Sequence, residues 1–304
     1  MSFMGQEKHC TLCPRRCGTR PGFCGAPDEL QVSAICLHRG EEPPVAGEKG
    51  IVNVFFSHCN LHCIYCQNEA ISGHRVDESL VHFHNVESVA DRVAELLPQS
   101  SGLLGFVTAA QYADFIPAII DNLAARGLHP TVVYNSSGYE SVETLRNLEG
   151  IVDIYLPDFK YADSKIAHAY SHAADYPEVA AKALAEMVRQ VGCGLKIDSD
   201  GIAYRGLIVR HLVLPGHVDN SLRVLDLLAN FQPSAFTFHL SLMAQYFPPV
   251  PTLPAPLNRT LIEEEYNAVV EHYNELGFFN GWLQELSSES HYRPDFSNKD
   301  NPFK

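Results

Sequence analysis

The stretch Ile51-Val52-Asn53-Val54-Phe55-Phe56-Ser57-His58-Cys59-Asn60-Leu61-His62-Cys63-Ile64-Tyr65-Cys66 joins an apolar run to three closely spaced cysteines. The run at 51–57 has the length and composition of a buried strand. The cysteines have the spacing C-x3-C-x2-C and begin two residues after the run, on the loop that leaves the predicted strand. Three thiolates within eight residues suit a soft, thiophilic centre such as an iron-sulfur cluster.

Further apolar runs of strand length alternate with helical stretches along the chain. We predict one helix that starts after an N-cap at Asn85 and a second that stops at Gly127. Later helices are predicted around 177–192 and 221–231. Repeated β-then-α units imply a parallel sheet, and we expect an α/β fold, a partial β/α (TIM-like) barrel. Ligands of such sheets bind at the carboxyl ends of the strands, where the cysteine triplet lies. The further predicted strands are 102–108, 130–135, 151–157, 207–215 and 235–241.

Composition and charge exclude several classes of protein. With 46% hydrophobic and 19% charged residues among 304, the chain reads as an ordinary globular protein. A net charge of −14 opposes binding to nucleic acid or to an anionic membrane surface. Because no apolar run is long enough to span a bilayer, we expect a cytoplasmic protein without a membrane partner. We expect a Cys-rich metal-stapled module at 1–45, the barrel at 46–280 and a C-terminal tail at 281–304.

Four of the nine cysteines, Cys10, Cys13, Cys17 and Cys24, form a second cluster with the spacing C-x2-C-x3-C-x6-C. In a reducing cytosol such thiols serve metals or redox chemistry and not a disulfide framework. A closed, tetrahedral zinc site is the simplest interpretation. A second iron-sulfur cluster and unmetallated thiols are the alternatives. His9 and Cys36 are candidate substitutes for one ligand, although an isolated cysteine such as Cys36 or Cys193 is usually a small buried hydrophobe.

The triplet offers three ligands, and three thiolates on a four-iron cube leave one iron open to a substrate or cofactor. A zinc site completed by His58 or His62 is the competing interpretation. The spacing, with the aromatic Tyr65 just before Cys66, resembles the signature of the radical SAM superfamily. That resemblance implies a 4Fe-4S cluster on Cys59, Cys63 and Cys66, whose open iron chelates S-adenosylmethionine (SAM). It also implies reductive cleavage of SAM to a 5′-deoxyadenosyl radical, with the electron supplied by a flavodoxin-type or ferredoxin-type donor.

Nearly the whole chain resembles a branch of that superfamily related to the pyruvate formate-lyase activating enzyme. The matching segments are Cys10-Thr11-Leu12-Cys13-Pro14-Arg15-Arg16-Cys17-Gly18, Glu41-Glu42-Pro43-Pro44, Val133-Tyr134-Asn135-Ser136-Ser137-Gly138-Tyr139, 152–161, 209–216 and 242–246. The resemblance implies a radical that abstracts hydrogen, with a glycine of a partner glycyl-radical enzyme as one substrate. A peptide or a small molecule is the alternative substrate. A non-catalytic iron-sulfur or zinc scaffold is the alternative class of protein.

The same resemblance assigns the residues that bind SAM. Asp158 and Lys160 stand at the Asp-x-Lys motif that contacts the methionine part of SAM, and carboxylate and ammonium groups suit that role. Arg210 stands at an arginine that reaches toward SAM, and Asn135 at a turn where it could bind ribose. The structural alternatives are a surface ion pair for Asp158 and Lys160, a buried structural pair for Arg210 and a turn for Asn135.

One segment departs from the family pattern. Typical members carry Gly-Gly-Glu-Pro after the second strand, whereas this chain reads Val107-Thr108-Ala109-Ala110-Gln111. The glutamate that would face the SAM ammonium is missing. Thr108 or Gln111 is a candidate replacement through neutral hydrogen bonds, and more of the ammonium contact then falls to Asp158.

Overall fold

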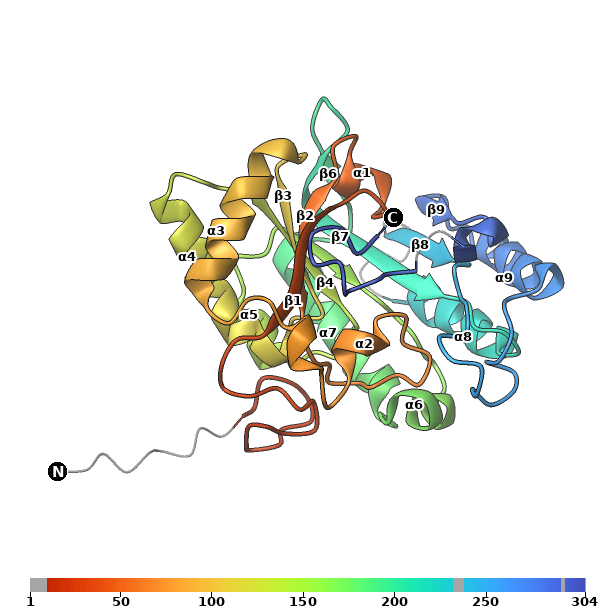
Figure 1. Ribbon diagram of the computed structural model, residues 1–304. Coiled ribbons are helices and arrows are strands. Elements are labelled where there is room, and N and C mark those ends of the chain that lie inside the picture. Colours follow the sequence, from red (N-terminus) through yellow and green to blue (C-terminus); the bar gives the residue numbers. More distant parts are fainter. Residues whose placement is uncertain (1–9, 232–237, 291–292, 304) are drawn as a thin grey trace.

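The computed structural model describes residues 10–231, 238–290 and 293–303 (Figure 1). Its strands are β1 (Val32–His38), β2 (Ile51–Phe56), β3 (Leu103–Val107), β4 (Thr131–Ser136), β5 (Ile154–Pro157), β6 (Lys196–Ile197), β7 (Ala203–Leu212), β8 (His239–Met243) and β9 (Gly281–Leu283). Its α-helices are α1 (Pro43–Ala46), α2 (Glu69–Ser72), α3 (Val86–Leu96), α4 (Ile116–Ala125), α5 (Val142–Asn147), α6 (Ser164–Ser171), α7 (Tyr176–Val191), α8 (Val218–Ala229) and α9 (Glu263–Glu275). Short 3-10 helices occupy Glu78–Leu80, Leu97–Gln99, Ala110–Phe115 and Leu286–Ser290.

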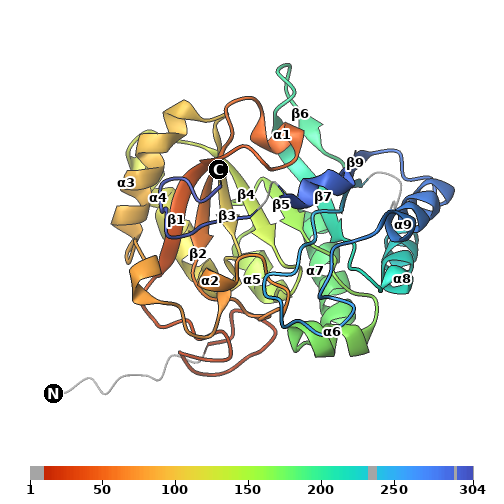
Figure 2. The same cartoon turned by 45° about the vertical axis from the view of Figure 1, so that its right-hand side comes forward.

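The strands form one curved sheet in the order β1-β2-β3-β4-β5-β7-β8-β9, with β6 paired to β7. From β2 to β9 the neighbours in this order are parallel, while β1 and β6 pair antiparallel with their neighbours. Helices α3 and α4 cover one end of the sheet and α8 and α9 the other (Figure 2). The predicted α/β fold, a partial barrel of parallel strands, is confirmed.

Strand β2 shows how the sequence builds two cores. Val52, Val54 and Phe56 alternate along the strand and pack in the layer between sheet and helices. The residues between them face the inside of the curve, where Ile51 joins a small apolar cluster. Asn53 also faces that side, buried and polar. The inner side of the sheet is therefore apolar near the start of the strands and polar further along, which leaves room for a site.

Several predicted elements lie where the sequence placed them. Helix α3 follows Asn85, whose Oδ1 accepts the N–H of Ser88 at 2.8 Å, as expected of an N-cap. Helix α4 ends at Ala125, two residues before Gly127. The predicted strand at 207–215 begins earlier and ends sooner, as β7 (Ala203–Leu212). The predicted strand at 235–241 is represented by β8, and its residues 235–237 lie outside the described part of the chain.

Both ends of the predicted barrel differ from the structure. Val32–His38, expected in a separate module at 1–45, pairs antiparallel with β2 as the edge strand β1. Gly281–Leu283, expected in a tail, extends the sheet as β9 beside β8. Gly281–Leu283 is too short to show a clear period, and Val32–His38 is buried on both faces and shows no alternation, so that pairing with neighbouring strands makes both part of the sheet.

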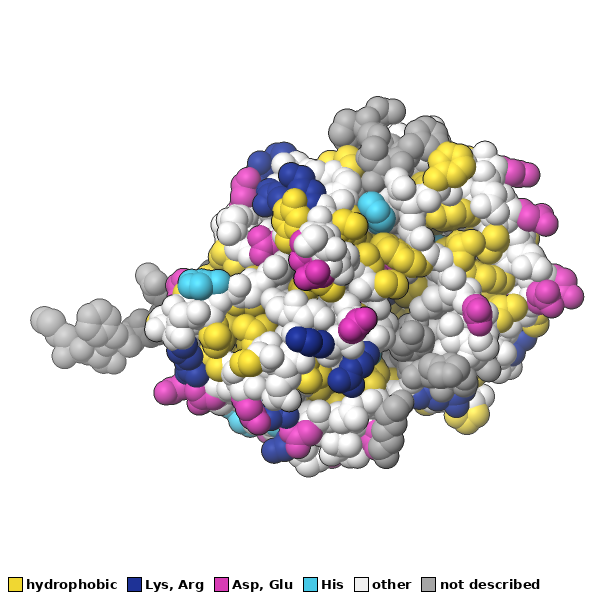
Figure 3. Space-filling model, turned by 90° about the horizontal axis from the view of Figure 1, so that it is seen from above, with side chains coloured by type: hydrophobic (Ala, Val, Ile, Leu, Met, Phe, Trp, Pro, Cys, Tyr) yellow, Lys and Arg dark blue, Asp and Glu magenta, His cyan; other side chains and the backbone are white. Residues whose placement is uncertain are grey.

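Residues 293–303 lie over the outer part of β1 and β2. Phe296 and Phe303 pack on the Phe55 ring, with centroids 5.6 and 5.4 Å away, and Asp300 pairs with Arg92 of α3 at 2.9 Å. In the view of Figure 3, basic and acidic side chains are interspersed and hydrophobic ones lie between them. Among the described helices, none is long and apolar enough to cross a membrane.

Candidate functional site

One cavity brings together the predicted cluster ligands and the predicted SAM-binding residues, with the exception of Gln111. It is lined by the three cysteines of the triplet and by residues at the carboxyl ends of β3, β4, β5 and β7. The lining includes Cys59, Cys63, Tyr65, Cys66, Thr108, Asn135, Asp158, Lys160 and Arg210. These residues span 152 positions of sequence from first to last, and the parallel sheet brings them together at the carboxyl ends of its strands.

The triplet loop, residues 57–72, holds its sulfur atoms with hydrogen bonds. The backbone N–H of Leu61 donates to Cys59 Sγ at 3.4 Å, and that of Asn68 donates to Cys66. Burial, reinforced by Cys63 and Cys66, raises the pKa of Cys59 to about 12. Free thiols here are therefore neutral, and a metal cation is what would hold them as thiolates.

Backbone strain is concentrated around the same cavity. His58 and His62 in the triplet loop have φ of 68° and 53°, and Thr108, across the cavity, has φ of 55°. Left-handed backbone is uncommon for these residue types and costs of order 1–3 kcal/mol each. Such conformations persist where the surroundings over-determine them, which is typical of functional loops.

A chain of hydroxyl groups connects the Tyr65 side chain to the sulfur of Cys63. The Tyr65 hydroxyl lies 2.5 Å from that of Tyr161, which lies 2.6 Å from Ser171 Oγ. Ser171 Oγ in turn donates to Cys63 Sγ at 2.9 Å. All three hydroxyl-bearing residues are buried, so this chain fixes the Tyr65 ring in the cavity wall and orients one cysteine of the triplet.

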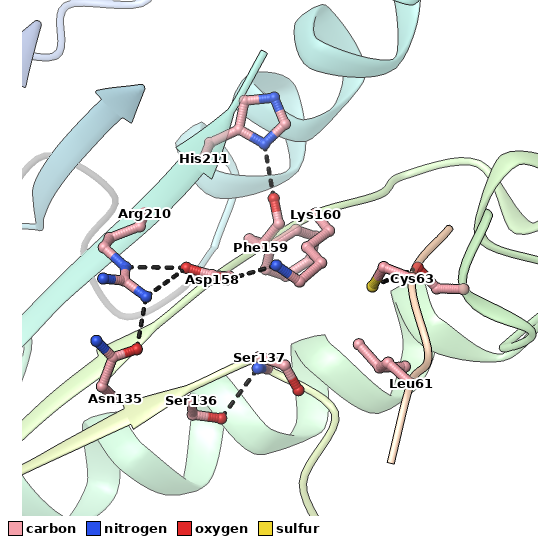
Figure 4. A network of polar contacts seen from close by, with 12 residues as sticks. Leu61, Cys63, Asn135, Ser136, Ser137, Asp158, Phe159, Lys160, Arg210 and His211 are labelled. Carbon is pink, nitrogen blue, oxygen red and sulfur yellow. Dashed lines mark hydrogen bonds and ion pairs between the residues drawn. The ribbon is translucent and has the colours of Figure 1, made fainter. Parts of the chain in front are cut away.

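Charged residues from β5 and β7 form the polar wall of the cavity (Figure 4). Asp158 accepts from Lys160 Nζ at 2.5 Å, and Arg210 Nε and Nη2 both lie 2.9 Å from its Oδ1. Burial opposes ionisation of Asp158, but Arg210 and Lys160 hold its pKa below the usual value. Arg210 Nη2 also donates to Asn135 Oδ1 at 2.6 Å. Asp158 and Lys160 thus form an ion pair in the cavity wall, with side chains that are 15% and 17% exposed.

Glu41 and Glu42 line the same cavity, and no role was predicted for either. Glu41 accepts from Asn53 Nδ2 at 2.9 Å and lies 3.4 Å from Arg210 Nη1. Burial raises the pKa of Glu42, whose buried Oε2 has no hydrogen-bond partner among the described residues. The only signal in the sequence was the Glu-Glu-Pro-Pro segment, because the position of both residues depends on the edge strand β1.

Thr108 and Gln111, the two candidate replacements for the missing glutamate, have different positions. Thr108 lines the cavity. Gln111 is not among the lining residues, and its side-chain amide donates to the carbonyl groups of Ser57, His58 and Thr108 at 2.8–3.0 Å. Gln111 therefore supports the backbone that leads into the triplet, while Thr108 keeps its place as the candidate for SAM.

The N-terminal cysteines lie outside this cavity. Cys10 borders a second cavity with Arg20 and Asp114, and the sulfur of Cys17 accepts the N–H of Phe23 at 3.3 Å. Among the residues that the structure describes, no three His, Cys, Asp or Glu side chains are grouped closely enough to hold a single metal ion. A four-iron cluster needs thiols spread around a larger body than one ion. The triplet lines the cavity with three thiols, of which Cys59 is buried and Cys63 and Cys66 are half-buried, and its donor set fits such a cluster.

No protein-family model matches the chain. An uncharacterised protein of Methanocaldococcus jannaschii is 28% identical over 273 residues, which cover 87% of this chain and 74% of that protein.

Two solved structures are similar to parts of this chain. A domain of pyruvate-formate lyase-activating enzyme from Bacteroides vulgatus is 14% identical with a TM-score of 0.39, covering 57% of this chain and 93% of that domain. SuiB of Streptococcus suis, bound to S-adenosylmethionine, is 10% identical with a TM-score of 0.48, covering 75% of this chain and 48% of SuiB. At these scores the roles of individual residues have to come from the cavity itself.

Proposed function

We propose that this chain is a radical SAM enzyme. The observation that carries the proposal is the meeting of the C-x3-C-x2-C triplet with Asp158, Lys160 and Arg210 in one cavity. The triplet offers three thiols to a four-iron cluster and leaves one iron for a ligand. The charged wall offers a carboxylate and two cations to a ligand that itself carries an ammonium and a carboxylate, as SAM does.

The residues of the polar wall bind different groups of SAM. Asp158 receives the ammonium of SAM, and Lys160 and Arg210 receive its carboxylate. Asn135 and Thr108 face the cavity with hydrogen-bonding groups for the ribose and adenine. When a reduced 4Fe-4S cluster is bound, it supplies the electron that splits the sulfonium bond and releases a 5′-deoxyadenosyl radical. Tyr65, held by Tyr161, gives the cavity a rigid aromatic wall.

The radical abstracts hydrogen from a substrate, with a glycine of a partner enzyme as one candidate and a peptide or small molecule as the second. The second candidate is favoured by Phe303, which lines the cavity and lies 4.3 Å from the His38 ring, because an aromatic residue there leaves less room for a protein loop. A flavodoxin-type or ferredoxin-type protein supplies the electron.

A second metal belongs to the same proposal, at Cys10, Cys13, Cys17 and Cys24. Zinc and a second iron-sulfur cluster are the two candidate centres. The cluster is favoured, because no three His, Cys, Asp or Glu side chains among the described residues lie close enough together to hold a single ion. Support comes from sulfur atoms that already accept backbone N–H groups, those of Arg15, Phe23 and Ala26, an arrangement that favours anionic sulfur. Metal analysis of Cys13→Ala distinguishes the forms, because loss of zinc and loss of iron and sulfide are different results.

Anaerobic reconstitution with iron and sulfide tests the proposed function. The reduced protein is expected to form 5′-deoxyadenosine and methionine from SAM, and Cys63→Ala is expected to form neither. A reconstituted wild type that forms no more 5′-deoxyadenosine than Cys63→Ala would support the alternative of a non-catalytic scaffold.

A further inference from the structure

The N-terminal cysteine loop, residues 10–26, packs directly on the triplet loop. Its Phe23 ring stacks on His62, with centroids 4.7 Å apart and planes at 20°. His62 Nε2 lies 3.4 Å from the carbonyl oxygen of Cys24, and the carbonyl of Phe23 lies 3.1 Å from His74 Nδ1. Since His62 stands between Cys59 and Cys63, the N-terminal cysteine loop packs directly against the part of the triplet loop that carries these two predicted ligands.

Arg15 makes the most concentrated contact between the loops. It stands between Cys13 and Cys17, and its guanidinium donates to three carbonyl groups from two distant segments. Nε donates to Asn60 O at 3.0 Å, Nη2 to Ser171 O at 3.2 Å, and Nη1 to His172 O. The fork geometry of an arginine makes such a three-way contact possible, and a lysine has no equivalent.

Each acceptor of Arg15 is tied to a predicted cluster ligand or to the segment that holds one. Asn60 follows Cys59 in the chain and donates through Nδ2 to the carbonyl of Tyr139 at 2.8 Å. Ser171 donates to Cys63 Sγ at 2.9 Å. The guanidinium is also fixed from its faces, 3.9 Å from the Phe23 ring centroid and 5.1 Å from that of Tyr139.

The sulfur atoms of the two loops share a local geometry. The N–H of the residue two positions later donates to the sulfur of Cys13 and of Cys24, as it does to that of Cys59 and of Cys66. Cys13 and Cys24 are also buried, as Cys59 is. Two loops built for thiolates are therefore joined through one arginine.

We propose that residues 10–26 fold around a thiophilic metal and that Arg15 is a positioning residue, which transmits this fold to Asn60 and Ser171 and so fixes Cys59 and Cys63. The inference rests on the proposed function, since it assumes a cluster on the triplet. It assigns to the N-terminal metal a structural effect on that cluster.

Arg15→Ala tests the positioning role, with Arg15→Lys and Arg16→Ala beside it. Arg16 is exposed, and removing it changes the charge by the same amount. After anaerobic reconstitution, Arg15→Ala is expected to load the SAM-responsive cluster several-fold less and to show altered g-values and midpoint potential in that cluster. Arg15→Lys is expected to restore these properties only in part, and Arg16→Ala to match the wild type. Circular dichroism checks that each variant folds.

Wild-type loading, g-values and potential in Arg15→Ala would overturn the positioning role. A wild type that binds no cluster on the triplet overturns the proposed function instead, and this inference with it. The metal is tested separately in a variant that lacks Cys59, Cys63 and Cys66. That variant is expected to retain zinc or iron and sulfide, and the ratio of these elements identifies the form. Retention of neither would overturn the metal part.

Discussion

The two cysteine loops differ in what they face and not in how they hold sulfur. Both direct backbone N–H groups at buried thiols. The triplet loop opens on the cavity that contains Asp158 and Arg210, whereas the N-terminal loop packs on the outside of the triplet loop through Arg15 and Phe23. The two loops therefore present sulfur in the same way. What distinguishes them is their surroundings, because only the triplet loop faces the cavity with the charged residues.

The largest expected effect is unequal between the two cysteine loops: loss of the triplet cluster leaves the N-terminal metal in place, whereas loss of the N-terminal metal also weakens the triplet cluster. Cys63→Ala removes a cluster ligand and is expected to abolish 5′-deoxyadenosine formation while leaving the N-terminal metal in place. Cys13→Ala is expected to lose the N-terminal metal and to retain a reduced amount of the SAM-responsive cluster. Metal content and SAM turnover of the two variants, measured side by side, check this asymmetry. Equal and complete loss of both centres in both variants would contradict it.

A second change concerns the charged wall that only the triplet loop faces. Asp158→Asn leaves Lys160 and Arg210 with less compensating charge in a buried place, and it removes a charged contact to the ligand. SAM affinity is expected to fall about a hundredfold, since one hydrogen bond to a charged group contributes about 1.5–3 kcal/mol.

Titration calorimetry with SAM measures the effect of Asp158→Asn. The matched control is Glu178→Gln, which removes a carboxylate from an exposed pair with Lys182. Such pairs contribute about 0–1 kcal/mol, so the control is expected to bind SAM as the wild type does. Equal affinities of Asp158→Asn and the control would remove Asp158 from the site.

A third prediction concerns Glu140, which lies beside Tyr139 between the two loops. Burial raises the pKa of Glu140 to about 7, and hydrogen bonds from Ser136 and Tyr134 oppose the shift. In the unfolded chain, Glu140 ionises near its ordinary pKa of 4.5. Its contribution to the free energy of unfolding is therefore fully present below pH 4.5 and is lost as the pH rises through about 7. The loss is expected to be about 3 kcal/mol.

Urea unfolding of the metal-free chain at pH 4.5 and pH 8 measures this loss. Glu140→Gln keeps the acceptor for Ser136 and cannot ionise, so the free energy of unfolding of the variant should fall by about 3 kcal/mol less over this range. Identical pH dependence of wild type and variant would show that Glu140 titrates normally.

The smallest effect is expected at Gly105 in β3, which packs against Asn53 of β2. A Cβ there would lie 2.0 Å from Asn53 Oδ1, so Asn53 must move and lose its bond to Glu41. Gly105→Ala is expected to lower the free energy of unfolding by about 1–3 kcal/mol, measured in urea. At Gly194 a Cβ meets nothing within 4 Å, and Gly194→Ala serves as the control. Equal stabilities would mean that Asn53 is not held in place.

Local patterns were predictable from the sequence, and long-range pairings were not. The triplet, the strand β2 and the cap at Asn85 each depend on a few neighbouring residues, and their positions are confirmed. Strand β1 and the place of Glu41 depend on pairing across the sheet, which no short window contains. The contact of Arg15 with Ser171 joins residues 156 positions apart, so spacing could not reveal it.

The central claim is that the triplet loop holds a cluster with one iron open to SAM. Electron paramagnetic resonance of the reduced, reconstituted protein tests it most directly, in a Cys13→Ala background that removes the second centre. Addition of SAM is expected to change the g-values of the remaining cluster, because the ligand binds an iron. A spectrum that SAM leaves unchanged, at concentrations that saturate the protein, would contradict the account.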